Sequence, residues 1–502
     1  MSSANQPHTS KSILRNVAFS SLTWFLPLGL SFVATPAIVR SLGNSDYGIY
    51  ALVLGFIGYS FTFSLGRAIT KYIAEYRNSG ESEKITNIIG ISILLNTVIG
   101  VLGVAILCSL APMLVRDVFN IDTAAQEKTI FAMYLASAII FVSMFNQIFN
   151  SMLQGIHRFD VYSKVYTANS IFLIGGNLVL AFLGYGLLPL LVWNLVVLVI
   201  FALVYAIVAK KLVPEFKLSF TLDTQTVRLV LRYSLGVVGY QILANFLLLF
   251  ERGWITHQLG SENLTYYVVP MSLGIYLHGF ISSLILVIFP LASELKDDHV
   301  RLLKLYTKAT KIIAMLVVFV MASVVINSRL FLHLWMGETF AQNSSTLLII
   351  HIFAFGLTAI LSVSWQMTEG LGFPRYNVAI FSVCIVINVV LMVLLTSAWG
   401  NYGVALSRLA GFGTIFVSIF LVERIFFRSV QLRFWFGLVG SLAVASVAAA
   451  LVEFLVSSNM TANWLAFFLS TIAGTVVFAF VLWLLDFVTP DEKLLLKGLI
   501  RR

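Results

Sequence analysis

Residues 187–209 read LLPLLVWNLVVLVIFALVYAIVA, and they decide the class of fold. The stretch contains no charged residue, and Lys210 and Lys211 follow it directly. As an α-helix rising about 1.5 Å per residue, a run of about 20 apolar residues crosses the hydrocarbon core of a bilayer, which is about 30 Å thick. This stretch therefore predicts a membrane-spanning helix.

The composition of the whole chain agrees with that prediction. Apolar residues make up 59% of the 502 residues and charged residues 11%, whereas soluble proteins hold about 45–50% and about 25% respectively. So few polar residues cannot cover the surfaces of several soluble domains. Despite the net charge of +10, the composition also excludes a disordered chain, a disulfide-stapled secreted fold and a nucleic-acid binder. Cys108 and Cys384 lie in apolar runs and are expected to be small core residues.

Fourteen apolar runs of the required length follow one another along the chain. The predicted spans are 16–39, 47–66, 85–111, 129–153, 165–184, 187–209, 233–258, 265–293, 312–335, 346–369, 377–397, 403–424, 435–456 and 463–486. Turn residues alone separate the spans at Gly184-Tyr185-Gly186 and at Trp399-Gly400-Asn401. The expected fold class is an all-α polytopic membrane protein with about 14 transmembrane helices.

The basic residues indicate the orientation of these spans. With both termini in the cytoplasm, the inner segments collect 26 of the 32 Lys and Arg residues. The other six are Arg40, Arg116, Lys128, Arg252, Arg329 and Arg408. Because cytoplasmic loops carry an excess of positive charge, we expect a multi-pass protein whose N- and C-termini are both cytoplasmic.

A weak internal repeat suggests two lobes. Leu42-Gly43 followed by Tyr50 recurs 217 residues later as Leu259-Gly260 followed by Tyr267, and Tyr185-Gly186 recurs at the same offset as Tyr402-Gly403. The offset pairs the first span with the seventh, so the copies share one orientation and would be related by an axis along the membrane normal. The predicted organisation is an N-lobe of six helices (1–209), a C-lobe of six helices (210–434), and helices 13 and 14 with a cytoplasmic tail (435–502).

Motifs for enzymatic chemistry are missing from the sequence. It contains no HExxH, no GxxxxGK[ST] and no paired CxxC. Asp297-Asp298-His299 is better interpreted as the solvated start of a helix than as a metal site. The longest outer loop, about residues 112–128, is too short for a catalytic domain. We therefore expect no enzyme, no catalytic residue, no bound metal and no cofactor.

Charged and amide side chains within or beside the spans are the candidate substrate-binding residues. A charged residue in a span is costly, so it usually faces a cavity or a partner. Glu251 and Arg252 are neighbours about 100° apart on a helix and do not naturally pair with each other. The full candidate set for a cationic central cavity is Arg252, Arg408, Glu251, Arg40, Arg329, Arg67, Asn146, Gln147, Gln241, Asn245 and Gln366. The structural alternatives are snorkelling to headgroups and hydrogen bonding between helices.

Three local motifs carry a resemblance to a known family. Residues 40–52, RSLGNSDYGIYAL, resemble the first outer loop of the polysaccharide transporter family, the Wzx-type flippases of lipid-linked oligosaccharides. This family belongs to the multidrug/oligosaccharidyl-lipid/polysaccharide exporter superfamily. Residues 64–66 and 71–76 resemble the inner end of its second helix, and Glu251-Arg252 with Leu259-Gly260 resembles its Asp-Arg…Leu-Gly segment. Glu251 replaces the usual Asp, and Thr265 stands where Gly is common.

The resemblance implies a flippase of the bacterial plasma (inner) membrane. It would carry an undecaprenyl-pyrophosphate-linked oligosaccharide from the inner to the outer leaflet by alternating access. The implied partners are the lipid-linked glycan, the bilayer and a glycan polymerase or other envelope-assembly proteins, with no nucleic acid, and the protein is expected to be a monomer. The energy source is open between protons, sodium and the membrane potential.

Three other functions remain open at this point. A flippase of lipid II, the peptidoglycan precursor, shares the fourteen-helix plan. A cation-coupled drug antiporter of the same superfamily usually has twelve helices and a buried acidic site. A membrane glycan polymerase or ligase would carry a long outer loop, which this sequence lacks.

Overall fold

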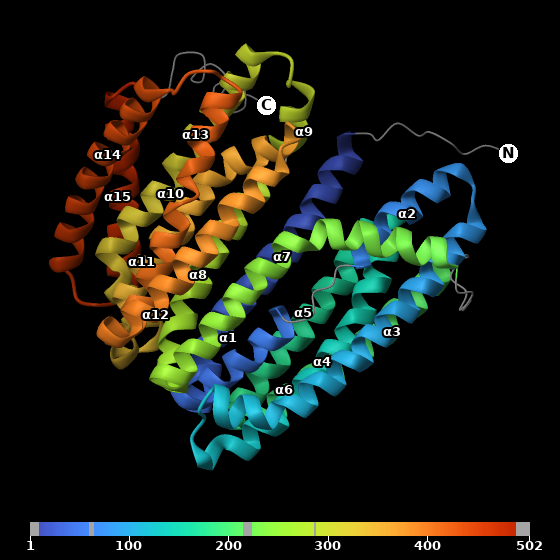
Figure 1. Ribbon diagram of the computed structural model, residues 1–502. Helices are drawn as coiled ribbons and strands as arrows, with labels where there is room; N and C mark the ends of the chain where they lie inside the picture. The colour runs from blue at the N-terminus through green and yellow to red at the C-terminus, as the bar shows by residue number, and fades with distance from the viewer. Residues whose placement is uncertain (1–9, 60–64, 214–222, 286–287, 488–502) are drawn as a thin grey trace. The chain divides into compact units, whose positions relative to one another are not determined.

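The computed structural model describes residues 10–59, 65–213, 223–285 and 288–487, with side chains described for these ranges except at 10–25, 65, 78 and 232–241. Within these ranges every regular element is a helix (Figure 1). The first unit, residues 1–265, and the second, residues 266–502, each pack internally. The elements are α1 (Ser10–Tyr59), α2 (Leu65–Ser79), α3 (Ser82–Met113), the π-helical turn η1 (Leu114–Val118), α4 (Thr123–Gly155), α5 (Phe159–Phe182), α6 (Leu187–Leu212), α7 (Thr224–Leu259), α8 (Ser261–Ile285), α9 (Ile288–Glu294), α10 (His299–Met336), α11 (Glu338–Gly370), α12 (Pro374–Gly413), α13 (Phe416–Ile425), α14 (Leu432–Ser458) and α15 (Trp464–Leu484).

These helices supply the predicted spans. Eleven stretches of the described chain are long and apolar enough to cross a membrane. Two of them, Leu26–Tyr59 and Pro374–Ile425, each overlap two predicted spans, and α7, which is not among the eleven, overlaps the remaining one. The prediction of an all-α membrane protein with about 14 transmembrane helices is therefore confirmed.

Two glycines at equivalent places in the repeat adopt the same backbone conformation. Gly43 has φ 76° and ψ 162°, and it kinks α1 between the first two spans. Gly260 has φ 88° and ψ 165°, and it separates α7 from α8. A positive φ of this kind is strained for residues with a Cβ atom, so glycine is required at both turns. The recurring Leu-Gly pair in the sequence thus marks a recurring turn in the backbone.

The division into compact units differs from the predicted lobe boundary. Helix α7 packs with α1, α2 and α3 and belongs to the first unit, whereas the sequence predicts that it is part of a C-lobe over residues 210–434. Compact packing and sequence repetition are different criteria, and the repeat-based boundaries at 209 and 434 stay predictions. The structure also makes the segment 65–79 a helix, where the sequence analysis expected a loop after residue 66.

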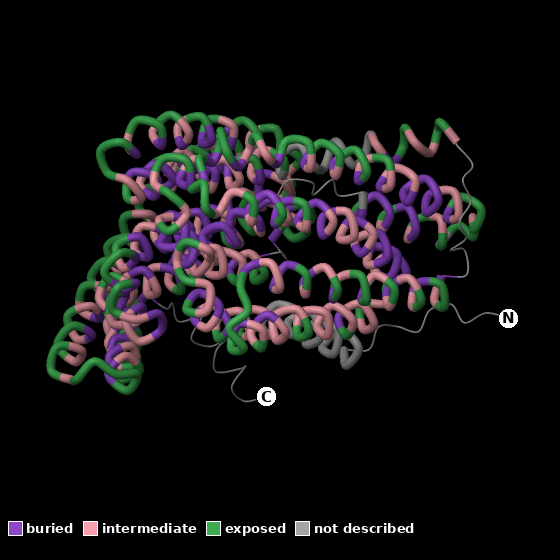
Figure 2. Tube along the Cα trace, turned by 90° about the horizontal axis from the view of Figure 1, so that it is seen from below, coloured by how far each residue is buried: buried purple, intermediate pink, exposed green. Residues whose placement is uncertain are grey.

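Each unit has an apolar core built from the facing sides of its helices. In the first unit, residues such as Ile73, Ile89, Met152 and Phe201 pack α2, α3, α4 and α6 together. In the second, buried side chains of α10, α14 and α15 form a separate cluster. Figure 2 shows buried residues on the inward sides of the helices and exposed residues on the outward sides.

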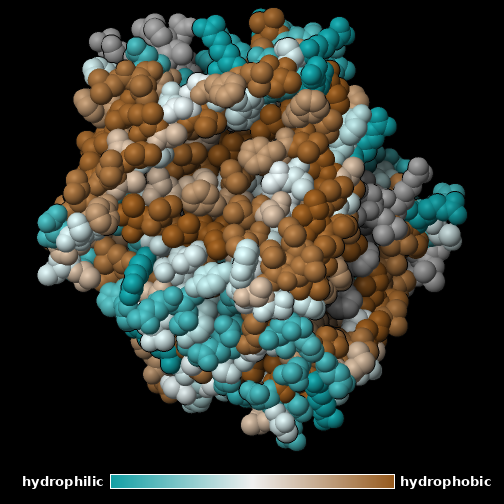
Figure 3. Space-filling model, turned by 60° about the vertical axis from the view of Figure 1, so that its left-hand side comes forward, coloured by the Kyte–Doolittle hydropathy of each residue, from teal (hydrophilic) through white to brown (hydrophobic). Residues whose placement is uncertain are grey.

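The outward sides of many helices are apolar as well. Phe182 and Phe436 leave 76% and 77% of their surface exposed, which would be unfavourable in water. Figure 3 shows hydrophobic side chains over a broad area of one face, with hydrophilic side chains gathered along its margins. A surface of this kind suits contact with lipid tails, and the protein is a multi-pass membrane protein.

Candidate functional site

A polar pocket of about 490 Å³ lies between α2, α4 and α5 of the first unit. Its lining carries two cations, three amides and three hydroxyl groups, and none of its lining residues is acidic. We call it the α2–α4 pocket. The lining residues are Gly66, Arg67, Thr70, Lys71, Gln147, Asn150, Ser151, Gln154 and Tyr162.

Helical spacing explains why these side chains share one pocket. Arg67, Thr70 and Lys71 are three and four residues apart, so they lie on one face of α2. The other face of the helix carries Ile69 and Ile73, which are fully buried in the core. On α4, Gln147, Asn150, Ser151 and Gln154 repeat at the same spacing. Each helix therefore offers one polar face to the pocket.

Close packing of α2 on α4 fixes the floor of the pocket. The Thr70 hydroxyl donates a hydrogen bond to the backbone oxygen of Ser151 at 3.1 Å. A Cβ atom on Gly66 would lie 2.4 Å from the Ser151 hydroxyl oxygen, so glycine is needed for this approach. At the other end of the contact, a Cβ on Gly155 would lie 2.9 Å from the Cβ of Ile73.

The electrostatics of the pocket favour an anion that also carries hydroxyl groups. Arg67 and Lys71 are exposed and contribute two positive charges. The side-chain oxygen of Asn150 is buried and accepts no hydrogen bond from any described residue. An arginine fork binds phosphate oxygens bidentately and a lysine binds them as a point charge, while amides and hydroxyls pair with sugar hydroxyls. The pocket can therefore hold a phosphate group next to a sugar.

Arg252 lies elsewhere in the first unit, between α7 and α1. Its Nη1 atom donates to the backbone oxygen of Ala51, and its guanidinium lies 5.3 Å from the centre of the Tyr59 ring. Its Nε atom is buried and has no hydrogen-bond partner among the described residues. Glycine at position 55 makes room for the side chain, since a Cβ there would lie 2.8 Å from Cδ of Arg252. The neighbouring Glu251 is fully buried.

The start of α7, which carries Arg252, is fixed by a cap. The Asp223 carboxylate accepts hydrogen bonds from the backbone N–H groups of Gln225 and Thr226 at 3.0 and 3.1 Å. The Thr226 hydroxyl also donates to this carboxylate, and these hydrogen bonds lower the pKa of Asp223 below its ordinary value. Such a cap satisfies N–H groups that have no partner within the helix.

Arg408 of the second unit is enclosed by the packing of α11 and α12. It is 1% exposed and lies 5.4 and 5.5 Å from the ring centres of Phe355 and Phe412. Beside these aromatic residues, the buried His351 has two ring nitrogens without a hydrogen-bond partner in the described part of the chain. The structure therefore places Arg408 in the helix packing of the second unit.

The other predicted residues are scattered. Arg40 is exposed, and Arg329 forms a 2.9 Å ion pair with Glu338 at the end of α10. Asn146 donates to the backbone oxygen of Leu198 at 3.2 Å, as expected for hydrogen bonding between helices. Two further amides, Asn245 and Gln366, are buried and half-buried respectively, and the Gln241 side chain lies outside the described residues.

Among the predicted residues whose side chains the structure describes, Arg67 and Gln147 alone line the pocket. The candidate set predicted from the sequence does not contain Lys71, Asn150, Gln154 or Tyr162. The spacing of the first three relative to Arg67 or Gln147 is a signal that could have found them. Tyr162 comes from α5, and nothing in its local sequence indicates that it lies near α2.

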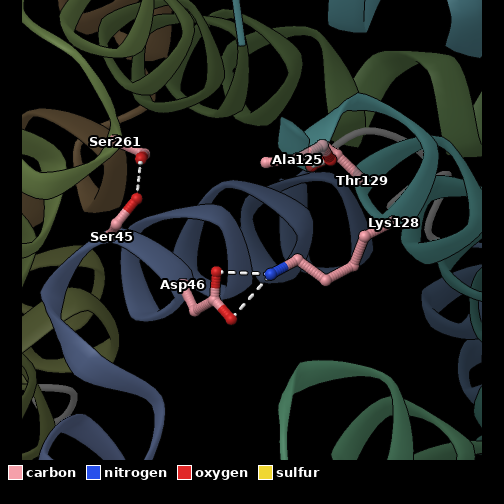
Figure 4. A network of polar contacts seen from close by, with 6 residues as sticks. All are labelled: Ser45, Asp46, Ala125, Lys128, Thr129 and Ser261. Atoms are coloured by element: carbon pink, nitrogen blue, oxygen red, sulfur yellow. Dashed lines mark hydrogen bonds and ion pairs between the residues drawn. The ribbon is translucent and has the colours of Figure 1, made fainter. Parts of the chain in front are cut away.

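The segment after Gly43, part of the stretch that resembles the family's first outer loop, has a structural role. Asp46 of α1 forms an ion pair with Lys128 of α4, with Nζ at 2.6 and 2.7 Å from the two carboxylate oxygens (Figure 4). Ser45 and Ser261 hydrogen bond through their hydroxyls at 2.9 Å. Thr265, which replaces a common glycine, donates to the backbone oxygen of Asn44 at 2.6 Å. The ion pair joins α1 to α4, and the two hydrogen bonds join the two repeated turns to each other within the first unit.

Comparisons with known proteins agree with this architecture. A family model described as polysaccharide biosynthesis protein matches residues 13–296. A curated protein of Shigella flexneri, whose name assigns it O-antigen transport, is 19% identical over 398 residues, covering 79% of this chain and 94% of that protein. The structure of the lipid II flippase MurJ in an inward closed conformation has a TM-score of 0.74 at 13% identity, over 94% of this chain and 99% of the other. An inward-facing multidrug resistance transporter of the MATE family has a TM-score of 0.62 at 18% identity, over 79% of this chain and 92% of the other.

Proposed function

Because this chain belongs to the polysaccharide biosynthesis protein family, we propose that it is a flippase for an undecaprenyl-pyrophosphate-linked oligosaccharide. It carries this lipid from the inner to the outer leaflet by alternating access. The observation that carries the proposal, together with the family, is the α2–α4 pocket, which sets two cations beside amides and hydroxyls. That combination suits a pyrophosphate joined to a glycan.

The physical problem that such a protein solves is the cost of moving polar groups through lipid. Each hydroxyl forced into hydrocarbon without a hydrogen bond costs several kcal/mol. In the proposed mechanism, Arg67 and Lys71 neutralise the pyrophosphate, while Gln147, Asn150 and Gln154 replace the water around the sugars. The polyprenyl tail stays in the bilayer throughout. An inside-negative potential favours outward movement of the headgroup by about 2.3 kcal/mol per charge per 100 mV.

The same proposal places the protein in its cellular setting. It acts as a monomer in the plasma (inner) membrane of a bacterium, with both termini in the cytoplasm. Its product is then available to a glycan polymerase or other envelope-assembly proteins at the outer surface. The related proteins named above are transporters, which supports transport without an enzymatic step.

A lipid II flippase is the second candidate, and the fold similarity to MurJ favours it. Deleting the gene distinguishes the two. We expect lipid-linked oligosaccharide to accumulate on the inner leaflet while peptidoglycan synthesis continues, because the curated relative described above is named for O-antigen transport. Leaflet-specific labelling of both lipids provides the measurement. Arrest of wall synthesis with accumulation of lipid II would select the second candidate.

The proposed orientation predicts where reporter fusions will be found. Fusions after Gly80 and Leu222 should be cytoplasmic, because the excess of basic residues lies on those segments. Fusions after Asn120 and Asn343 should be outside. Alkaline phosphatase reports an outside fusion and a fluorescent protein reports an inside one. A reversed signal at any of the four sites would contradict the proposed topology.

A further inference from the structure

One carboxyl group in the second unit is buried in the middle of a helix cluster. Glu453 of α14 is 1% exposed, and α14 packs side by side with α10 and α15 (Figure 1). Its Oε2 atom accepts hydrogen bonds from Ser323 at 3.0 Å and from the Asn327 amide at 2.6 Å. The side-chain oxygen of Asn327 in turn accepts a hydrogen bond from Ser470 of α15 at 3.2 Å.

The second oxygen of this carboxyl group has no such support. Oε1 of Glu453 is buried and has no hydrogen-bond partner among the residues that the structure describes. It points at Gly474 of α15, where a Cβ atom would lie 2.2 Å from Oε1. Glycine at that position leaves space for the carboxyl group and offers it no polar side chain.

Another buried acid in the same unit provides a contrast. Glu423 is also fully buried, but both of its oxygens are satisfied. Oε1 accepts from the Trp435 indole at 2.6 Å and from the Tyr306 hydroxyl at 3.1 Å, and Oε2 accepts from the backbone N–H of Gln431 at 2.6 Å. Glu423 therefore has the contacts of a structural carboxylate, whereas Oε1 of Glu453 lacks them among the described residues.

No described cation compensates a charge on Glu453. Helix α15 has no titratable residue, and the other one on α14, Arg433, lies 20 residues away near the start of the helix. On α10, the neighbouring Arg329 is exposed and paired with Glu338 at 2.9 Å, and Lys311 lies over the Phe487 ring, three turns before Ser323. A carboxylate buried without a cation is strongly disfavoured and is neutralised by taking up a proton.

We propose that Glu453 is a membrane-embedded proton-binding site formed by α10, α14 and α15, and that its protonation couples the transport cycle to the proton gradient. A proton from water forms an O–H bond at Oε1 and cancels the negative charge, and its release restores the carboxylate. This inference rests on the proposed function only in naming lipid transport as the process that the proton drives. The site itself stands on the contacts of Glu453.

The hydrogen-bond donors around the Glu453 carboxyl group favour binding of a proton over binding of a sodium ion. The Asn327 amide presents N–H to the carboxyl group, and its oxygen is engaged by Ser470. A sodium ion needs several oxygen ligands directed at one point, and an N–H donor there repels it. On the proposed topology, Glu453 lies about 7 Å along the helix from the outer end of α14 at Ser458. Protons from the outer side would therefore reach it first.

The first experiment reads the carboxyl group directly and does not depend on transport. The full-length protein is reconstituted in lipid, and infrared difference spectra are recorded during a pH titration. We expect a protonated-carboxyl band that titrates, disappears in Glu453→Gln and stays in the matched control Glu423→Gln. Glu453→Asp should keep a titrating band at a shifted frequency. An unchanged band in a folded Glu453→Gln variant would overturn the proposal.

The second experiment measures coupling in proteoliposomes that contain lipid-linked oligosaccharide, at zero membrane potential. With one proton per lipid, a gradient of one pH unit should change the steady-state ratio between the leaflets about tenfold. We expect this dependence to be lost in Glu453→Gln and retained in Glu423→Gln. If Glu453→Gln retained the dependence on the pH gradient, the proposed coupling would be overturned. The same holds if a sodium gradient could replace the pH gradient in driving transport by the parent protein.

The two experiments also separate this inference from the proposed function. If no lipid-linked glycan moves at all in the parent protein while the infrared band still depends on Glu453, the flippase proposal fails and the proton site remains. If translocation proceeds and the infrared band does not depend on Glu453, the proton site fails and the flippase proposal remains.

Discussion

Replacing Arg67 and Lys71 together by glutamine is expected to reduce transport of lipid-linked oligosaccharide by about 100-fold or more. Hydrogen bonds to charged groups contribute about 1.5–3 kcal/mol each, which corresponds to about 10–100-fold per residue. Glutamine keeps length and polarity but removes both charges from the α2–α4 pocket. Because both side chains are exposed, the folded helix pair should tolerate the change. Translocation per molecule in proteoliposomes, normalised to membrane abundance, is the measurement.

A matched control separates the pocket from the general surface charge of the same region. Lys84 is also a basic residue near α2, but it pairs with Glu81 and does not line the pocket. Lys84→Gln should leave transport within about twofold of the parent protein, since exposed ion pairs contribute little. Equal losses of transport in the variant with Arg67→Gln and Lys71→Gln and in Lys84→Gln would show that transport depends on net charge and not on the pocket.

Replacing Arg252 by alanine is the second change with a large expected effect, a loss of about 10–100-fold in transport. The guanidinium is partly buried between α1 and α7, and its Nε–H lacks a partner among the described residues. A cation in such a position is suited to an anion that arrives with the substrate. Arg252→Lys should retain part of the activity, because a lysine keeps the charge but not the planar fork.

Stability measurements decide whether Arg252 acts on substrate or only on packing. Besides its contact with the Ala51 backbone, the side chain packs over Tyr59 and beside Gly55. If it acts on substrate, Arg252→Ala should keep normal membrane abundance and a melting temperature within a few degrees of the parent. The exposed Arg116 supplies the control, and Arg116→Ala should transport normally. A well-folded Arg252→Ala protein with full activity would remove Arg252 from the mechanism.

The fold class could be predicted from local sequence because a membrane span is a local property. A run such as residues 187–209 spans a bilayer whatever it packs against, and the basic residues between spans bias its orientation. The Leu-Gly pairs at 42–43 and 259–260 were visible as a repeat, and both glycines adopt a similar positive φ, 76° and 88°. The ends of the helices could not be predicted as well as their number. The second predicted span ends at residue 66, whereas the structure has a helix, α2, from Leu65 to Ser79.

The candidate site was predicted only in part. Charge within a span drew attention to Arg408, yet the structure encloses it between Phe355 and Phe412. Arg67 and Gln147 were both assigned to a central cavity, but the sequence did not indicate that these two, among the eleven candidates, line one pocket. Glu453 was not singled out at all, because a single acidic residue near the end of an apolar run has the sequence of an ordinary helix terminus.

The sequence by itself determined that the chain is helical, spans a membrane many times and resembles polysaccharide transporters. These conclusions depend on composition and on patterns within 20 or so neighbouring residues. The tertiary structure alone decided which side chains meet. Arg67, Gln147 and Tyr162 come from three helices, as do Glu453, Asn327 and Gly474. These side chains come together because each helix has a particular rotation and depth relative to its neighbours. Packing between segments that are distant in the sequence determines that rotation and depth.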